Sequence, residues 1–198
     1  AKVFWVLLLG SYGNYYVSIA FVALFAAIFK YLPQKLEKIT GIYVLVASLV
    51  ILLTNLNSLS LANHKVSTPL GSIFTENSLA ESSNQLIDFI NKNTKQDDKI
   101  VIFPEGMTIN FLAQRRSDDY YNSLLPLYTE TFGEEKIIKH YKGNLPEFVI
   151  FNNLDMKDYY FRYICQDYAL EFCGFVQNNY ELQTVIGDEF RYLIFKRK

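Results

Sequence analysis

The first quarter of the chain consists of long apolar stretches separated by one short polar turn. Residues 15–31 and 39–56 are almost wholly apolar, and the turn from Lys30 to Lys38 carries lysines on both sides of Pro33. As helices, stretches of about 17 residues are long enough to cross a hydrocarbon core of roughly 30 Å. The pattern therefore predicts two transmembrane helices.

A shorter apolar stretch, residues 3–9, precedes these two spans. Seven residues are too few to cross a bilayer. We interpret the stretch as the end of a further span, and the chain as the carboxyl-terminal part of a polytopic protein. Short lysine-rich loops resist translocation, so the turn around Pro33 should stay in the cytoplasm. We therefore expect an integral protein of a bacterial inner or plasma membrane. Everything after Leu56 should lie on the extracytoplasmic side.

The pattern changes after the second apolar stretch. Residues 57–76 are predominantly polar and contain the breakers Pro69 and Gly71, which predicts a linker. Residues 77–198 hold most of the acidic residues of the chain, as a domain in water does. A domain of this size can bury a hydrophobic core. The sequence therefore predicts a truncated transmembrane region (1–56), a linker and an extracytoplasmic domain.

Within this domain the hydrophobic period alternates between that of helices and that of strands. The continuous apolar run at 99–103 is typical of a strand that is buried on both faces. The predicted fold class is α-helical transmembrane segments followed by a small α/β domain, with a mixed sheet in three layers. Helices are expected over residues 78–93, 105–114, 131–141 and 156–172, and strands over 99–103, 148–151, 181–186 and 191–196.

Charge and composition narrow the classes of function. A formal net charge of -1 with mixed signs leaves no basic stripe, so nucleic acid is not an expected partner. His64 and His140 lie at no metal-ligand spacing from a cysteine or carboxylate. We also find no Asp-x-Asp pair, no glycine-rich phosphate loop and no nucleophile elbow. No catalytic residue, metal site or cofactor is therefore assigned.

The two cysteines, Cys165 and Cys173, lie in the segment predicted as the last helix. Eight residues of continuous helix hold two Cα atoms about 12 Å apart, which is too far for a disulfide. We therefore expect two buried thiols. A disulfide requires a broken helix, and an oxidising location keeps that alternative open.

Polar residues gather after the strand at 99–103. Glu105 follows this strand directly, and Arg115 and Arg116 follow the short helix after it, ahead of Tyr120 and Tyr121. Ligands gather at the carboxyl edge of open α/β sheets, and helix amino ends attract anions. These five residues form our candidate substrate-binding site. In the structural alternative, Glu105 complements a helix dipole, the arginines cap carbonyls and the tyrosines pack.

The same region carries a family resemblance. Val101 to Arg115, with its Pro-Glu-Gly turn and Asn-Phe-Leu-x-x-Arg helix, resembles the carboxyl-terminal region of bacterial integral-membrane glycosyltransferases. Tyr120 to Asn122 and Leu125-Pro126 extend the likeness. These are GT-C type enzymes, similar to dolichyl-phosphate-mannose protein mannosyltransferases.

The resemblance implies an enzyme that transfers sugar from a polyprenyl-phosphate donor to a lipid, glycan or protein acceptor on the outer face of the bilayer. It also implies that the catalytic acid lies far upstream, in the first extracytoplasmic loop. The extracytoplasmic domain would then cover the active site. From residue chemistry we assign Arg115 or Arg116 to the donor phosphate and Glu105 to a hydroxyl.

A second interpretation involves no catalysis. An anchored α/β domain outside the cell is also what a ligand sensor or an interaction module of the cell envelope requires. The residues by themselves leave both interpretations open.

Overall fold

The computed structural model describes residues 62–118 and 120–198, together with ten single positions between residues 26 and 60. The chain divides into two compact units, Ala1–Ser60 and Leu61–Lys198. The second unit contains every strand and all the numbered helices of the described part.

The predicted fold class is wrong in its transmembrane part. Among the residues that the structure describes, no helix combines the length and the apolar composition that crossing a bilayer requires. The longest of the numbered helices, α4 (Asn77–Asn93), is amphipathic and leaves polar residues at the surface. The predicted stub 3–9 and the predicted spans 15–31 and 39–56 lie outside the described residues, apart from nine of the single positions.

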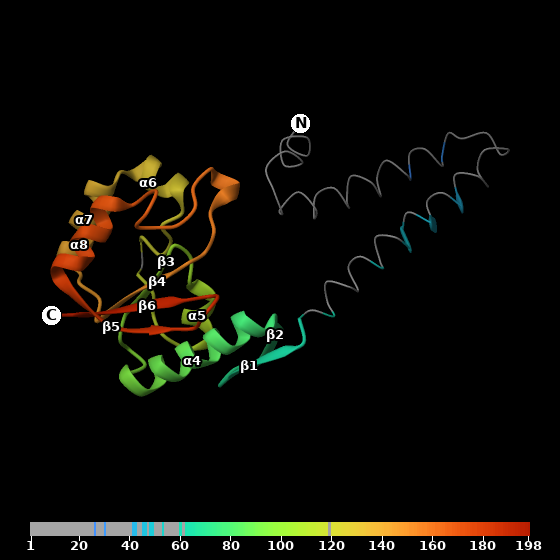
Figure 1. The fold of residues 1–198 in the computed structure, drawn as a ribbon, viewed down its shortest axis with the longest axis horizontal. Coiled ribbons are helices and arrows are strands. Elements are labelled where there is room, and N and C mark those ends of the chain that lie inside the picture. The colour runs from blue at the N-terminus through green and yellow to red at the C-terminus, as the bar shows by residue number, and fades with distance from the viewer. Residues whose placement is uncertain are drawn as a thin grey trace. The chain divides into compact units, whose positions relative to one another are not determined.

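The centre of the second unit is a mixed four-stranded sheet, shown in Figure 1. Its strands lie in the order β3 (Ile100–Phe103), β4 (Phe148–Asn152), β6 (Tyr192–Arg197) and β5 (Tyr180–Ile186). β3 and β4 are parallel, whereas β6 is antiparallel to both of its neighbours. The predicted mixed α/β sheet is therefore confirmed for this unit.

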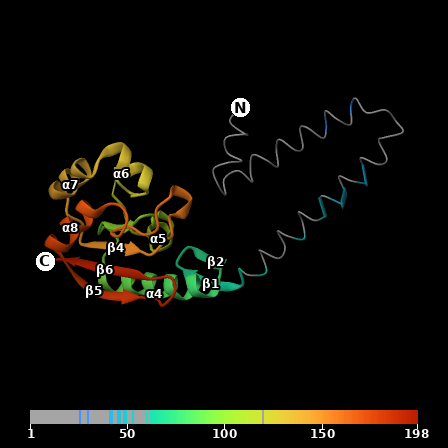
Figure 2. The ribbon, with the colours of Figure 1, turned by 45° about the horizontal axis from the view of Figure 1, so that its top comes forward.

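Helices cover both faces of the sheet because its central strands are apolar on both sides. Ile100 and Ile102 pack towards α4 and α5 (Met107–Leu112), whereas Val101 and Phe103 belong to a second core. That second core includes residues of α7 (Glu134–Gly143) and α8 (Leu170–Asn179). Figures 1 and 2 both show α4 on one side of the sheet and α7 and α8 on the other.

The segment that was predicted as a linker is folded. β1 (His64–Thr68) and β2 (Gly71–Thr75) form an antiparallel hairpin. Val66 is buried in the core beside α4, and the Asn84 side chain hydrogen-bonds the backbone of Lys65 and Ser67. Pro69 and Gly71, which we interpreted as linker residues, lie at the hairpin turn.

Two of the predicted helices need smaller corrections. α4 confirms the helix predicted at 78–93, although it begins one residue earlier and its amino end has no side-chain cap. The helix expected at 131–141 is divided at Gly133 into α6 (Pro126–Phe132) and α7. Gly133 adopts φ 78°, a left-handed conformation that ends α6.

The helix predicted at 156–172 is wrong. Only a single 3-10 turn, η1 (Lys157–Tyr159), forms there, and α8 begins at Leu170. Because the chain is not helical between them, Cys165 and Cys173 lie with their Cα atoms 5.5 Å apart and form a disulfide. The prediction of two buried thiols is therefore wrong as well. Aromatic residues at a near-helical spacing caused the error, since here they pack from a loop.

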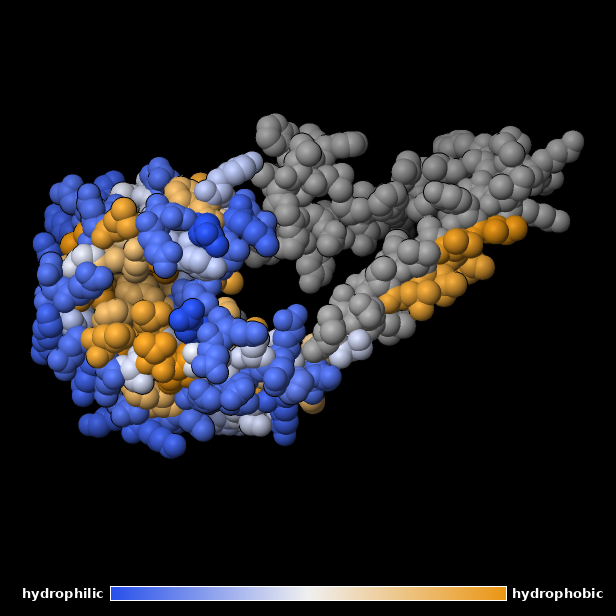
Figure 3. Space-filling model, viewed as in Figure 1, coloured by the Kyte–Doolittle hydropathy of each residue, from blue (hydrophilic) through white to orange (hydrophobic). Residues whose placement is uncertain are grey.

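The carboxyl-terminal hairpin confirms its prediction, with β5 and β6 antiparallel over residues 180–197. β5 is one of the two edge strands, and its Leu182 and Val185 are about half exposed. On the face viewed in Figure 3, apolar side chains gather over these two strands.

Candidate functional site

The carboxyl end of β3 is closed by tightly bonded backbone. The Pro104 carbonyl oxygen accepts hydrogen bonds from the Leu124 amide at 2.8 Å and the Ser123 hydroxyl at 3.0 Å. A Cβ atom at Gly106 would overlap Ile102, so only glycine fits this turn. The Pro-Glu-Gly sequence therefore directs the chain from β3 into α5 without space for a larger residue.

Glu105 lies in this turn, and its side chain is exposed. Its carbonyl oxygen accepts a hydrogen bond from the buried Asn152 side chain at 2.9 Å, which fixes the turn against the end of β4. Its backbone also pairs with Ser123. Within residues 62–118 and 120–198, its carboxylate makes no hydrogen bond or ion pair. Glu105 thus extends an exposed carboxylate from a backbone that is fixed at the carboxyl edge of two parallel strands.

Arg115 is positioned at the other end of β3, and its guanidinium is used within the fold. Nε donates to the Thr94 hydroxyl at 2.9 Å, and Nη2 donates to the Thr94 carbonyl at 3.0 Å. Nη1 donates to the Ala113 carbonyl at 2.8 Å. Thr94 is the residue that ends α4, so the Arg115 side chain joins the carboxyl ends of α4 and α5. This arrangement is the capping role of the structural alternative.

Arg116 pairs with the start of β3, where its carbonyl oxygen accepts the Ile100 amide at 2.9 Å. Both arginines line an open pocket of about 510 Å³. In this pocket the Asn110 side-chain oxygen is buried and has no partner within the described part of the chain. The other lining residues come from the hairpin turn, the loop before β3 and α5: Leu70, Gln96, Asp97, Phe111 and Gln114.

The structure therefore separates residues that the sequence placed in one site. Glu105 follows the carboxyl end of β3, whereas Arg115 and Arg116 lie near Ile100 at its amino end. Five residues of extended chain span about 16 Å. The arginines and Glu105 consequently cannot bind the same phosphate group, because α5 carries the chain back along the strand before the arginines occur.

The two tyrosines lie between these ends, and their environments differ. The segment from Arg116 to Ser123 contacts β3 at both ends, which places Tyr120 and Tyr121 along the edge of the sheet. Tyr121 is only 8% exposed and belongs to the core beside α7, whereas Tyr120 is 66% exposed. Burial raises the pKa of the Tyr121 hydroxyl. Packing therefore explains Tyr121, while the Tyr120 ring is open to a ligand.

Next to these tyrosines lies a pair of residues that the sequence analysis did not bring together. Asp118 and His140 are in contact, with the imidazole Nε2 2.9 Å and 3.0 Å from the two carboxylate oxygens. The Asp118 side chain is buried and also accepts the amide hydrogens of Tyr120 and Tyr121, each at 2.8 Å. An ionised carboxylate can only accept, so Nε2 carries the proton in this pair.

The electrostatics of the pair favour an ionised Asp118. Burial alone would raise the pKa of this carboxyl group, but the hydrogen bonds from His140 and the two amides outweigh it. The net result is a pKa below the ordinary value of 3.8. The imidazole is held in addition by neighbouring aromatic rings, with centroids 5.2 Å away for Tyr121 and 5.3 Å for Tyr141.

The sequence offered only a weak signal for this pair. His140 lies on α7 beside the buried positions Ile137 and Tyr141, which predicts a partly buried imidazole that needs a partner. The partner is 22 residues away in a turn, so no local spacing identifies it. Acidic residues in a polar turn are usually solvated, whereas the structure buries Asp118.

The arrangement contains no complete catalytic centre among the described residues. Groups of three or more potential metal ligands are absent from the part of the chain that the structure describes. What the carboxyl edge of β3 and its neighbouring turn offer instead are the exposed carboxylate of Glu105 and the oriented imidazole of His140. Both can accept a hydrogen bond from a ligand hydroxyl.

Comparison with known proteins adds no identification. No protein-family model matches the chain, and no curated protein matches it.

Proposed function

We propose that this chain belongs to a glycosyltransferase that takes its sugar from a polyprenyl-phosphate donor, and that the described domain lies over the substrate without supplying the catalytic acid. The single observation that carries the proposal is the placement of Glu105. Every neighbouring part of the Pro-Glu-Gly turn is fixed by internal hydrogen bonds or close packing, and the carboxylate alone is left exposed.

The residues that carry the family resemblance act as one structural unit, which supports using them together. Asn110 donates to the Ile100 carbonyl at 2.8 Å and so attaches α5 to β3. Leu124, just before the Leu-Pro pair, donates to Pro104. A motif that is mostly structural but holds one exposed carboxylate is consistent with a positioning role for Glu105.

Among the candidate residues, we assign only Glu105 to a substrate hydroxyl. Arg115 is already bonded to Thr94 and to the end of α5, so a donor phosphate would compete with those bonds. Arg116 stays a candidate for the phosphate, since it lines the pocket at the amino end of β3. The proposal thus places hydroxyl and phosphate recognition in separate regions.

The disulfide supports a location outside the cytoplasm. Disulfides persist in oxidising compartments and are rare in reducing ones. Both cysteines of this sequence are joined, so the substitution Asn144→Cys introduces a free thiol where the sequence has none. Asn144 is exposed after α7. We expect a membrane-impermeant thiol reagent to label this variant in spheroplasts, and protection from the reagent would place the domain in the cytoplasm.

Sugar transfer tests the function itself. Membranes from cells that produce the intact protein should transfer labelled sugar from a polyprenyl-phosphate mannose or glucose donor, above membranes from cells without it. Glu105→Gln should lower transfer about tenfold, because it weakens a charge-assisted hydrogen bond. Glu181→Gln, a substitution of an exposed glutamate on β5, is the matched control and should transfer normally.

Two results would reject the proposal. One is an absence of transfer with either donor at matched protein levels, and the other is normal transfer by Glu105→Gln. The first result would favour the non-catalytic interpretation as a sensor or interaction module, for which the exposed aromatic and apolar side chains at Tyr120, Tyr160 and Leu127 are the relevant observation.

A further inference from the structure

The second ring nitrogen of His140 is left to accept a hydrogen bond. Nε2 donates to Asp118, so the other ring nitrogen, Nδ1, is the acceptor in the neutral imidazole. Within residues 62–118 and 120–198, Nδ1 makes no hydrogen bond. The side chain is 26% exposed, and the buried carboxylate fixes the orientation of the ring. A buried acid that orients a partly exposed imidazole makes a rigid acceptor for a hydroxyl or amide hydrogen.

An exposed aromatic ring, that of Tyr120, lies beside this acceptor. The Tyr120 ring is exposed, and its centroid is 6.1 Å from that of His140 and 4.7 Å from that of Tyr121. Tyr121 in turn contacts Phe132, whose ring stacks on the half-exposed Tyr128 at 5.9 Å. The Asp118 carboxylate fixes the backbone of Tyr120, so the ring extends from a held turn.

We infer that Tyr120, His140 and Asp118 form a carbohydrate-binding site for the acceptor glycan. A sugar ring presents apolar C–H groups on its face and hydroxyls at its rim. Tyr120 offers a surface for the first and Nδ1 of His140 an acceptor for the second. Asp118 is a positioning residue, since it acts through the imidazole and the turn.

The ligand class rests on the proposed function, which supplies an acceptor glycan as substrate. The position agrees with it as well. Tyr120 is three residues from Ser123, so their Cα atoms lie within about 11 Å. Ser123 pairs with Glu105. A bound oligosaccharide can therefore extend from Tyr120 towards the carboxyl end of β3.

Saccharide titration monitored by NMR tests the inference in the unmodified full chain. The sequence has two histidines, so the imidazole signals are easily assigned, and the exposed His64 on β1 is an internal control. We expect methyl α-mannopyranoside, methyl β-glucopyranoside or N-acetylglucosamine, added at millimolar concentration, to shift the His140 signals and leave those of His64 unchanged. Equal shifts of both histidines, or of neither with all three saccharides, would overturn the inference.

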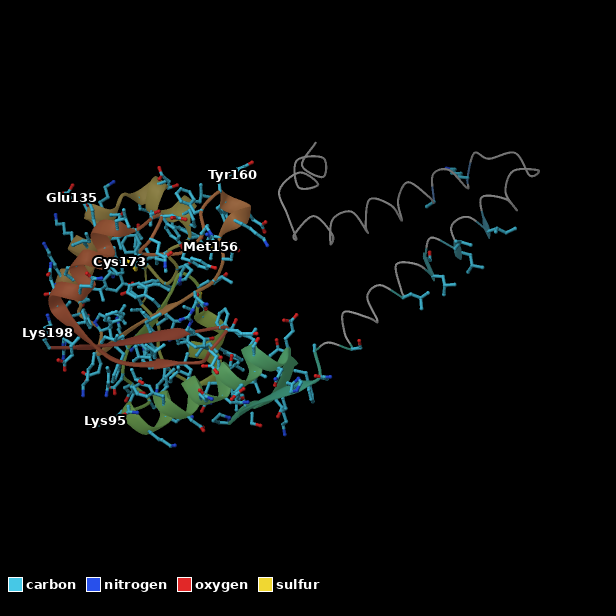
Figure 4. The ribbon with its side chains drawn as sticks, viewed as in Figure 1. Lys95, Glu135, Met156, Tyr160, Cys173 and Lys198 are labelled. Atoms are coloured by element: carbon cyan, nitrogen blue, oxygen red, sulfur yellow. A yellow bond between two sulfur atoms is a disulfide. The ribbon has the colours of Figure 1, made fainter. Side chains whose placement is uncertain are left out.

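Two variants locate the site. Tyr120→Ala should weaken binding of the same saccharide about tenfold, the loss typical of one aromatic contact. Tyr160→Ala removes a tyrosine that is 98% exposed on the loop after β4, where Figure 4 shows it at the outer surface, and it should bind normally. Equal affinities for the two variants would reject Tyr120 as part of the site.

His140→Gln sharpens the assignment of the acceptor. Its amide can still donate to Asp118 but does not present an imidazole Nδ1 in the same place, so we expect about fivefold weaker binding with an unchanged unfolding midpoint. Binding is measured without a donor, so an unmodified protein that transfers sugar normally but binds none of the saccharides would reject only this inference. Binding by a protein that fails to transfer sugar would instead reject the proposed function.

Discussion

Arg115 and Glu105 are both charged, lie near opposite ends of the same strand, and have opposite relations to the fold. The Arg115 guanidinium donates to the end of α4 and the end of α5, whereas the Glu105 carboxylate contacts solvent. The difference teaches that charge and position in a motif do not identify a ligand site. What distinguishes the two is whether hydrogen-bonding capacity is left over after folding.

Asp118 extends this comparison, because it is both more buried than Arg115 and adjacent to an open site. Three groups donate to its carboxylate, and the same contacts orient His140. We therefore expect the loss of stability caused by a substitution to be largest at Asp118. At Glu105 we expect a loss of function with little loss of stability.

The largest effect is expected for Asp118→Asn. The amide has the shape of the carboxylate but loses its charge and one acceptor, so the free energy of unfolding should fall by about 3 kcal/mol. Urea unfolding of the full chain measures this, with Asp88→Asn on the exposed face of α4 as control. A loss below about 0.5 kcal/mol would show that the pair contributes little to the fold.

Acid should reproduce part of this loss in the unmodified chain. The folded-state pKa of Asp118 is lowered, so its contribution is fully present above the unfolded value of about 3.8 and is lost as pH falls through the folded value. Unfolding free energy should therefore drop more steeply in the unmodified chain than in Asp118→Asn as the pH falls through and below about 3.8. Equal slopes would contradict the lowered pKa.

The next largest effect is expected for the disulfide. It joins residues 8 positions apart, and the chain-entropy relation gives about 2.5 kcal/mol for a loop of that size. The double variant Cys165→Ser with Cys173→Ser should lose this amount, as should the unmodified chain under reductant. Amide exchange should increase first in residues 157–168, where few backbone groups are in regular structure.

A smaller loss is expected for Arg115→Ala, about 2 kcal/mol, because the end of α4 loses its two donors from this side chain. Arg115→Lys should recover little of it, since an ammonium lacks the guanidinium geometry. Arg191→Ala, a substitution at an exposed position before β6, is the control and should stay within about 0.5 kcal/mol. Control-like behaviour of Arg115→Ala would return this residue to the list of ligand-binding candidates.

The smallest effect on stability is expected for Glu105→Gln, within about 0.5 kcal/mol, because its side chain has no partner in the described residues. Thermal unfolding of the full chain measures this. A clear loss of stability would mean that the carboxylate supports the turn, and the comparison with Arg115 would then fail.

The spacing of apolar residues in the sequence was enough to predict the helices and strands that bury one face or both faces. α4, β3, β4 and the carboxyl-terminal hairpin follow from the spacing of apolar residues, because burial against a sheet imposes that spacing. The prediction of a helix at 156–172 was wrong because aromatic residues that pack from a loop can have the same spacing as one face of a helix. The hairpin at 64–75 was missed because only Val66 is buried within it.

The sequence identified the individual residues of the candidate site, but it did not predict which of them lie together in the folded chain. The sequence by itself determined that Glu105 directly follows a buried strand and that a tyrosine pair follows two arginines. Only the tertiary structure decided that α5 carries the arginines to the far end of β3, that one tyrosine is buried, and that Asp118 meets His140. Sequence patterns record local burial, whereas these contacts join residues far apart along the chain, and their positions depend on how the helices pack on the sheet.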